Sequence, residues 1–205
     1  LSISGSDQVW SPRCVDFDPA YFLTFADDKQ KYSYAASFAV PTLPDEFIDE
    51  YKKRLNGFQK FSVREPSGEK LVKELTGRTA ETHLDPTLLI SADEWKKIAV
   101  SKIDKPYILI FTANPAVSLV DFALKLSKEK NLPIYCINDA PHPVSHGINY
   151  IVAPTVEEFV GYFKNAEYVV TNSFHGTAFS VIFNKNLFVE FKNKSGRNIR
   201  SEGLL

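Results

Sequence analysis

Short apolar segments alternate with amphipathic ones through the second half of the chain, and this alternation constrains the fold more than any other feature. Each apolar segment predicts a strand, and each amphipathic segment predicts a helix. Strands are predicted at Tyr107–Phe111, Ile134–Ile137, Tyr150–Val152, Tyr168–Val170 and Leu187–Phe191, and helices at Leu119–Lys130, Thr155–Lys164 and Gly176–Phe183. Strands that are apolar throughout are buried on both faces, so the pattern predicts a parallel sheet covered by helices on both sides.

The first half of the chain shows the same alternation less regularly. Its strands are predicted at Leu1–Ser4, Lys31–Phe38, Phe58–Val63 and Glu81–Leu84, and its helices after Pro44 and at Glu69–Leu75. We therefore predict an α/β protein with two Rossmann-like lobes, residues 1–95 and residues 96–205, each built on a parallel sheet. The connection is expected within residues 91–106, where a helix precedes a polar, lysine-rich stretch that closes at Pro106.

The length and charge of the chain narrow the classes of function. The 205 residues are enough for two small domains or one large one. The net charge of -1 argues against nucleic-acid binding and against strong attachment to a membrane surface, because both need a basic face. No apolar run approaches the roughly 18 residues that a membrane span requires, so only a peripheral membrane contact is compatible with the sequence.

Cysteine usage favours a cytoplasmic location. The two cysteines, Cys14 and Cys136, form no CxxC pair and imply no disulfide framework. The chain has no methionine and begins at Leu1 within an apparent strand. We therefore expect the N-terminal lobe to lack its start.

Three polar clusters directly follow predicted strands. They are Ser4-Gly5-Ser6-Asp7-Gln8, Arg64-Glu65 and Asn172-Ser173-Phe174-His175-Gly176. Ligands of parallel α/β sheets bind beyond the carboxyl ends of the strands, so these clusters supply the candidate binding residues.

His175 has two interpretations. In the first, Gly176 permits the close approach of a ligand or of another backbone segment, the start of the next helix favours an anion, and the histidine transfers a proton near neutral pH. In the second, the histidine is hydrogen-bonded within the core. The local pattern does not separate the two.

The basic residues that could bind an anion each have an alternative, non-binding interpretation. Arg64 can bind a carboxylate or a phosphate through two parallel hydrogen bonds, or it can form a surface ion pair with Glu65 or Glu69. The basic run after the last predicted strand includes Lys194 and Arg197. This run either completes an anion site or is a solvated tail.

The first polar cluster suits a sugar. Asp7 and Gln8 can bind sugar hydroxyls, Trp10 can stack on a sugar ring, and Asp7 can deprotonate a hydroxyl. The alternative is an ordinary turn in which Asp7 caps a helix and Trp10 belongs to the core.

The remaining histidines do not predict a metal site. His83 lies on a predicted short strand, and Pro143 separates His142 from His146, so one helix cannot present that pair. We expect no protein-bound metal. The phosphate-binding glycine motifs of P-loop and dinucleotide-binding proteins do not occur.

Five segments resemble the polysaccharide pyruvyl transferase family in their residues and in their order along the chain. They are SGSDQVWSP (4–12), KYSYAASFA (31–39), FSVREPSG (61–68), LTGR with LDPTLL (75–78 and 84–89) and YVVTNSFHGTAFSVIFNK (168–185). Each segment is modest alone, but together they are specific and cover nearly the whole chain. The family's usual N-terminal strand and Gly/Asn-rich loop do not occur in this sequence.

The resemblance implies a two-lobed fold similar to that of the GT-B glycosyltransferases, with the acceptor on residues 1–95 and the donor on residues 96–205. It implies transfer of a pyruvyl group from phosphoenolpyruvate to sugar hydroxyls of a bacterial exopolysaccharide or cell-surface precursor, with release of phosphate. The implied partners are phosphoenolpyruvate, as donor substrate without a further cofactor, and a sugar or lipid-linked oligosaccharide. A homo-oligomer is compatible with the sequence.

The resemblance maps the family's basic residues onto Arg64 and His175. We expect Arg64 to bind the carboxylate or phosphate of the donor, and His175 to protonate the enol methylene carbon or to bind the phosphate. Asp7 is the candidate base for the sugar hydroxyl. The residues expected to bind substrate are Ser4, Gly5, Ser6, Gln8, Trp10, Asn172, Ser173, Gly176, Thr177, Lys194 and Arg197.

Two alternatives stay open. A glycosyltransferase of the same architecture would bind a nucleotide sugar and would need a carboxylate for the ribose, for which Glu157 and Glu158 are candidates. A sugar-binding or scaffold protein without catalysis would leave Arg64 and His175 apart from each other or within the core.

Overall fold

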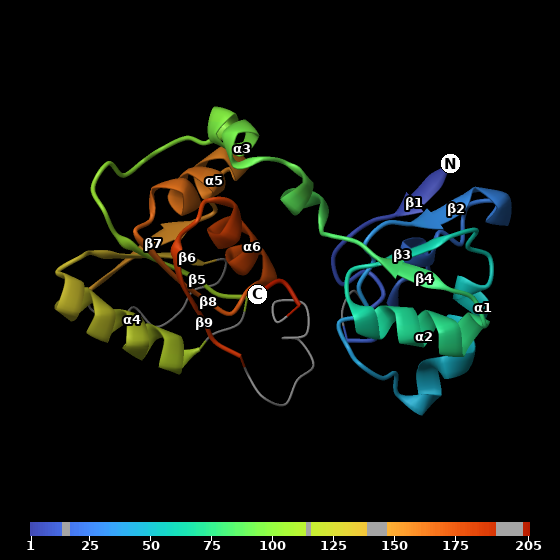
Figure 1. Cartoon of the computed structure of the whole chain (residues 1–205). Helices are drawn as coiled ribbons and strands as arrows, with labels where there is room; N and C mark the ends of the chain where they lie inside the picture. The colour runs from blue at the N-terminus through green and yellow to red at the C-terminus, as the bar shows by residue number, and fades with distance from the viewer. Residues whose placement is uncertain (14–16, 114–115, 139–146, 192–202) are drawn as a thin grey trace. The chain divides into compact units, whose positions relative to one another are not determined.

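The computed structural model describes residues 1–13, 17–113, 116–138, 147–191 and 203–205 (Figure 1). It divides into two compact units: unit 1 comprises Leu1–Leu89 with the described C-terminal residues 203–205, and unit 2 comprises Ile90–Phe191. The strand pairs of both units are parallel, so the predicted α/β class with parallel sheets is confirmed. The assignment of residues 1–95 to an acceptor lobe and of residues 96–205 to a donor lobe stays a prediction.

Unit 2 is built on a five-stranded parallel sheet with the strand order β7-β6-β5-β8-β9. Its strands are β5 (Ile108–Phe111), β6 (Ile134–Asn138), β7 (Ile148–Val152), β8 (Tyr168–Thr171) and β9 (Asn186–Val189). The chain starts at the central β5, adds β6 and β7 on one side, and then crosses over to add β8 and β9 on the other. The strand order therefore reverses between β5 and β8, which is where doubly wound sheets bind their ligands.

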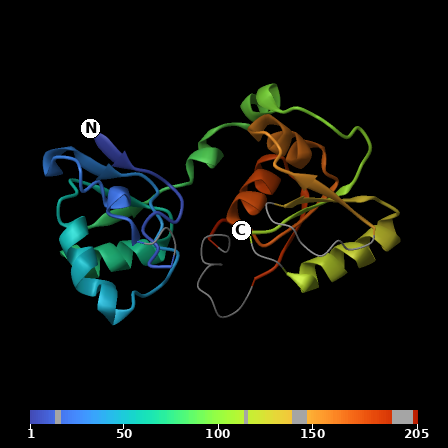
Figure 2. The ribbon, with the colours of Figure 1, turned by 180° about the vertical axis from the view of Figure 1, so that it is seen from behind.

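Helices cover both faces of this sheet, as Figure 1 and the reverse view in Figure 2 show. One face carries α4 (Val117–Lys130), and the other carries α3 (Ala92–Ile98), α5 (Val156–Asn165) and α6 (Phe174–Ile182). Alternate residues of β5 divide between the two layers: Ile108 and Ile110 belong to the core under α4, and Leu109 belongs to the core on the opposite face. All three are fully buried, which explains why the strand is apolar throughout.

Local signals set several helix ends in unit 2. Thr155 and Glu158 form a capping box at the start of α5, where the Thr155 hydroxyl accepts a hydrogen bond from Glu158 N and the Glu158 carboxylate accepts one from Thr155 N. At the other end of a helix, Asn131 adopts the left-handed conformation directly after α4. These ends fix where the loops at the sheet edges begin.

The described residues of unit 1 form four short parallel strands. They are β1 (Ser2–Ser4), β2 (Lys31–Ser33), β3 (Phe61–Val63) and β4 (Ala80–Thr82). β1 pairs with β2 and β3 with β4, and single bridges at Tyr32–Lys60 and Ala36–Val63 join the two pairs. The strands therefore lie side by side in chain order, and their carboxyl ends share one edge.

The helices of unit 1 enclose an aromatic core with these strands. The helices are α1 (Ile48–Leu55) and α2 (Pro66–Thr76). Trp10 and Tyr51 are both fully buried in this core, and the Tyr51 hydroxyl donates to Trp10 O at 2.6 Å. Pro66 begins α2, three residues before the helix start predicted at Glu69, because the first turn of a helix needs no N–H from its proline. Gly77 ends α2 in the left-handed conformation, with a φ of 72°.

The strand predicted at Lys31–Phe38 is shorter in the structure, where β2 ends at Ser33. Ala35 has a left-handed φ of 48°, which interrupts the extended backbone, and its N–H donates to Ser62 Oγ at 2.9 Å. An L-residue in this conformation costs about 1–2 kcal/mol, so the surrounding hydrogen bonds must hold the kink. The alternation of residue types along the sequence predicted a longer strand because it carries no information about such a kink.

Candidate functional site

An ion-pair cluster lies at the carboxyl ends of the unit 1 strands. Arg64, directly after β3, donates from Nη1 to Asp85 Oδ2 at 2.6 Å and from Nη2 to Asp7 Oδ1 at 3.2 Å. Ser6 donates to the same Asp85 oxygen at 2.6 Å. We call Ser6, Asp7, Arg64 and Asp85 the Arg64 cluster. It joins the segments that follow β1, β3 and β4, because parallel strands bring these segments to one edge.

Asp85 anchors this cluster, and the candidate residues chosen from the sequence did not include it. Its side chain is 3% exposed, and Oδ1 accepts from Thr87 N at 3.0 Å and from Thr87 Oγ1 at 2.8 Å. Burial by itself would raise the pKa of the Asp85 carboxyl, but the hydrogen bonds from Ser6, Thr87 and Arg64 outweigh it and lower the pKa to about 2. The signal available in the sequence was an aspartate directly after a predicted strand in the segment LDPT.

Arg64 is more enclosed than the sequence suggested. Its side chain is 2% exposed, and its acidic partners are Asp85 and Asp7 rather than Glu65 or Glu69. Two carboxylates already lie against the guanidinium, so binding of a donor anion by Arg64 would require an exchange of partners. The donor-binding role of Arg64 stays a prediction.

Glu65 has a separate, structural role. It is 1% exposed, and Oε1 accepts hydrogen bonds from Ser37 Oγ at 3.0 Å, from Phe38 N at 2.9 Å and from Ala39 N at 3.1 Å. The carboxylate thereby fixes the loop that follows the kink at Ala35. In the segment Val63-Arg64-Glu65, Arg64 therefore belongs to the Arg64 cluster, and Glu65 stabilises the neighbouring loop.

Asp7 is the solvent-facing carboxylate of the Arg64 cluster. Its side chain is 60% exposed, while Oδ1 accepts from Arg64 Nη2 and from Gln8 N. Its backbone φ of 81° is one that aspartate tolerates better than most residues. An accessible carboxylate held by two donors can accept the proton of a hydroxyl.

The structure corrects the prediction that Trp10 stacks on a sugar ring. Trp10 is fully buried, and the rings of Phe22, Phe38 and Phe58 surround it at centroid distances of 6.1, 5.3 and 5.3 Å. No ring face is left for a ligand, so Trp10 belongs to the core, which was the alternative interpretation. Ser4 is also enclosed, and its hydroxyl donates to Tyr21 O at 2.7 Å.

The other residues of this loop remain accessible. Gly5 is exposed, and Ser6 and Gln8 are half-buried. Ser6 already belongs to the Arg64 cluster, and Gln8 lies beside Asp7. Their predicted contacts with a substrate stay predictions.

In unit 2, the polar cluster after β8 lies at the reversal of strand order. Asn172 Oδ1 accepts from Ala113 N at 3.0 Å, which ties the loop after β8 to the loop after β5. Thr171 Oγ1 donates to Phe111 O and accepts from Ser173 N at 3.0 Å. Two neighbouring loops are thus held together at the place where a ligand of this kind of sheet binds.

His175 lies in the first turn of α6, which begins two residues earlier than predicted. Ser173 caps this helix by accepting a hydrogen bond from Gly176 N at 3.5 Å. The His175 side chain is half-buried, and its ring contacts Phe174 edge-on at a centroid distance of 5.4 Å. The structure therefore places His175 at the carboxyl edge of the sheet, and its catalytic role stays a prediction.

Two predicted binding residues of α6 face their own chain. A Cβ on Gly176 would lie 2.2 Å from Thr171 Oγ1, so the glycine allows α6 to pack onto the end of β8. Thr177 is buried, and its hydroxyl donates to Ser173 O at 3.0 Å. The space beside Gly176 is therefore taken by a threonine oxygen of the same chain, and the predicted contact of Gly176 with a ligand stays a prediction.

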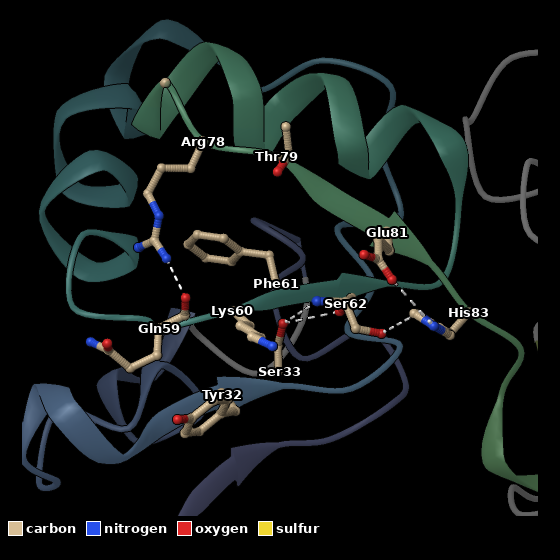
Figure 3. Close-up of a pocket in the computed structure, with 11 residues that line it drawn as sticks. Tyr32, Ser33, Gln59, Lys60, Phe61, Ser62, Arg78, Thr79, Glu81 and His83 are labelled. Carbon is tan, nitrogen blue, oxygen red and sulfur yellow. Dashed lines mark hydrogen bonds and ion pairs between the residues drawn. The ribbon is translucent and has the colours of Figure 1, made fainter.

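A polar pocket with a volume of about 700 Å³ lies in unit 1 and shares no residue with the Arg64 cluster (Figure 3). Side chains from β2, from β3 and from the segment around β4 line it. Its lining residues are Tyr32, Ser33, Gln59, Lys60, Phe61, Ser62, Gly77, Arg78, Thr79, Glu81 and His83.

Several predicted residues lie outside the described ranges. These are Lys194 and Arg197 of the basic run, together with Cys14, His142 and His146. Among the residues that the structure describes, no group of three or more His, Cys, Asp or Glu side chains could hold a metal ion. Over the same ranges, no helix has both the length and the apolar character that a bilayer crossing needs.

Each of the two parallel α/β units carries polar side chains at the carboxyl ends of its strands, which is the edge where sheets of this kind bind ligands. The family model for polysaccharide pyruvyl transferase matches residues 1–189 of the 205. The chain therefore belongs to the polysaccharide pyruvyl transferase family, whose name denotes transfer to polysaccharides, and the resemblance seen in the sequence is confirmed. A search of curated proteins gives no significant match.

Proposed function

We propose that the protein transfers a pyruvyl group from phosphoenolpyruvate to two hydroxyls of a sugar in a cell-surface polysaccharide or exopolysaccharide precursor. The central carbon of the donor forms two bonds to sugar oxygens, and its bond to the phosphate oxygen breaks. One hydroxyl proton goes to the methylene carbon, which becomes a methyl group, and the other goes to the departing phosphate. The products are a ketal-linked pyruvate and inorganic phosphate, and no oxidant or reductant is needed.

The observation that carries this proposal is the family match over residues 1–189. The chemistry of the sheet edges is compatible with it, because unit 1 presents an accessible carboxylate and unit 2 presents an imidazole beside a helix start. Phosphoenolpyruvate is formed inside cells, so we place the reaction in the cytoplasm, with the acceptor carried there on a lipid.

In unit 1, we assign the proton of the attacking sugar hydroxyl to Asp7. Arg64 holds the Asp7 carboxylate through Nη2, and Asp85 holds Arg64 through Nη1. Arg64 and Asp85 are then positioning residues of the acceptor side.

In unit 2, we assign the donor to the start of α6. The N-terminal end of a helix favours an anion, and His175 in this first turn can protonate the methylene carbon or bind the phosphate. Asn172 and Ser173 shape the turn that presents the histidine.

The proposal is tested by phosphate release from phosphoenolpyruvate in the presence of lipid-linked and nitrophenyl sugars. We expect release that depends on the sugar, a loss of kcat in His175→Ala and in Asp7→Asn, and no loss in Asp49→Asn, whose exposed carboxylate lies on α1. Arg64→Lys should keep the charge but lose the fork that contacts two carboxylates, so it should lower kcat as well.

Two outcomes would replace the proposal. Saturable binding of a nucleotide sugar without phosphate release would indicate a glycosyltransferase, which the doubly wound sheet of unit 2 also suits. Sugar binding with no turnover of either donor would indicate a non-catalytic sugar-binding protein.

A further inference from the structure

Both residues of the Asp7–Arg64 ion pair are tied through their backbones to the same short segment. Ser37 N donates to Asp7 O at 2.9 Å. From the other side, Arg64 N donates to Ala36 O at 3.2 Å. Bridges between Asp7 and Ala36 and between Ala36 and Val63 place this segment between the two charged residues. The segment therefore sets the separation of the two backbones that carry the ion pair.

Two alanines in an unfavourable backbone conformation flank this segment. Ala35 has a φ of 48° and Ala39 has a φ of 54°, and both residues are buried. A left-handed φ brings the Cβ of an L-residue too close to the following carbonyl oxygen, so the surrounding structure must hold both residues in place. Strain of this kind occurs most often at functional sites.

The Glu65 carboxylate holds the strained segment. Its Oε1 accepts hydrogen bonds from Phe38 N at 2.9 Å and from Ala39 N at 3.1 Å. A third hydrogen bond comes from Ser37 Oγ at 3.0 Å. Hydrogen bonds to a carboxylate are stronger than those to a neutral oxygen, so three of them on one atom can offset the strain of the backbone.

This arrangement costs more stability than packing of the segment requires. Glu65 is 1% exposed, and within the described ranges its Oε2 is buried without a hydrogen-bond partner. A buried carboxylate with one unsatisfied oxygen lowers stability. Glycine at positions 35 and 39 would adopt the same φ values without strain, and a neutral acceptor at position 65 would then suffice. A feature that reduces stability in this way is expected where accurate placement of a functional group matters more.

We propose that Glu65 is a positioning residue, which holds residues 36–39 in place so that this segment keeps the Asp7 carboxylate against Arg64. Glu65 acts without touching the substrate, because its effect passes through the backbone hydrogen bonds of Ala36 and Ser37. The inference rests on the proposed function in one respect, since it takes Asp7 as the base for the sugar hydroxyl. A loosened segment would misplace this base and leave the donor site proposed in unit 2 unchanged.

The test begins with Glu65→Gln in the full chain. Glutamine keeps the size of the side chain but accepts weaker hydrogen bonds, so both the free energy of unfolding and the kcat of phosphate release should fall. We expect kcat per folded molecule to fall about ten- to a hundredfold, the scale for a reacting group misplaced by about 1 Å, with an unchanged KM for phosphoenolpyruvate. The matched control Glu74→Gln removes an exposed charge from α2 and should change neither quantity.

Adding Ala39→Gly to Glu65→Gln separates positioning from stability. Glycine relieves the strain, so the double variant should regain most of the lost free energy of unfolding, while its kcat stays low because the carboxylate is still absent. Recovery of kcat together with stability, no recovery of stability, or a wild-type kcat in Glu65→Gln would each overturn the proposal. If Glu65→Gln does not fold, Ser37→Ala removes one of the three donors and should lower kcat to a smaller extent.

A measurement without turnover keeps this proposal distinct from the proposed function. The side-chain N–H signals of Arg64 in nuclear magnetic resonance report its contact with Asp7. Glu65→Gln should shift these signals, the double variant should keep the shift, and Glu74→Gln should leave the signals in place. Unshifted Arg64 signals in Glu65→Gln would refute the positioning role. Shifted signals in a protein that releases no phosphate would refute the proposed function alone.

Discussion

Replacing Asp85 with asparagine tests whether charge holds the Arg64 cluster together. The pKa of Asp85 lies at about 2 instead of 3.8. Each pKa unit corresponds to about 1.36 kcal/mol, so ionisation of this carboxyl contributes at most about 2.5 kcal/mol to folding. Solvent around the cluster screens the charges, which reduces this contribution to about 1–2 kcal/mol. The variant also leaves buried Arg64 with one acidic partner fewer, and we expect a total loss of about 2–3 kcal/mol near neutral pH.

The pH dependence distinguishes charge from packing. The folded-state pKa is lowered, so the stabilisation is fully present above the unfolded-state pKa of about 4 and is lost as the pH falls through about 2. Roughly half of it should be gone near pH 3. Urea unfolding should therefore be measured near neutral pH and near pH 3. The difference in free energy of unfolding between wild type and Asp85→Asn should be smaller near pH 3, and Asp49→Asn should match wild type at both pH values. An equal difference in the free energy of unfolding between wild type and Asp85→Asn at both pH values would refute the reasoning.

Three further changes test individual contacts by urea unfolding. Gly176→Ala should lower the free energy of unfolding by about 1–3 kcal/mol, because the new Cβ meets Thr171 Oγ1; an unchanged value would contradict the tight packing of α6 on β8. Thr155→Ala should cost about 1 kcal/mol by removing the cap of α5, and Thr155→Ser should restore most of it; equal losses in both would contradict the capping role. Trp10→Ala should lower the free energy of unfolding by about 3–5 kcal/mol, because Trp10 is fully buried. A variant of unchanged stability with weakened sugar binding would instead indicate that Trp10 contacts the ligand.

The fold of unit 2 could be predicted because its signals are local. Ile108, Leu109 and Ile110 face two different cores, so the strand carries no polar residue and is recognised at once. The capping box at Thr155 likewise spans only four residues. The strand order, by contrast, depends on which strands meet in space, and the sequence supported only a parallel sheet.

The site in unit 1 could be predicted only in part. Arg64 and Asp7 were recognised because each follows a predicted strand, but their ion pair joins residues 57 positions apart. Asp85 also follows a predicted strand, but it was missed because its burial depends on Arg64, which lies 21 residues away in the sequence. Trp10 could not be assigned to the core or to the ligand from sequence, because its burial depends on rings contributed by distant segments.

The most direct test of the proposed pyruvyl transfer follows the carbon atoms of isotope-labelled phosphoenolpyruvate onto a sugar acceptor by nuclear magnetic resonance. If the proposal is correct, the labelled methylene carbon appears as a methyl group in a ketal on the sugar, phosphate is released in equal amount, and both signals vanish in His175→Ala. Release of phosphate with pyruvate left free in solution, or transfer of a sugar from a nucleotide donor to the same acceptor, would contradict it.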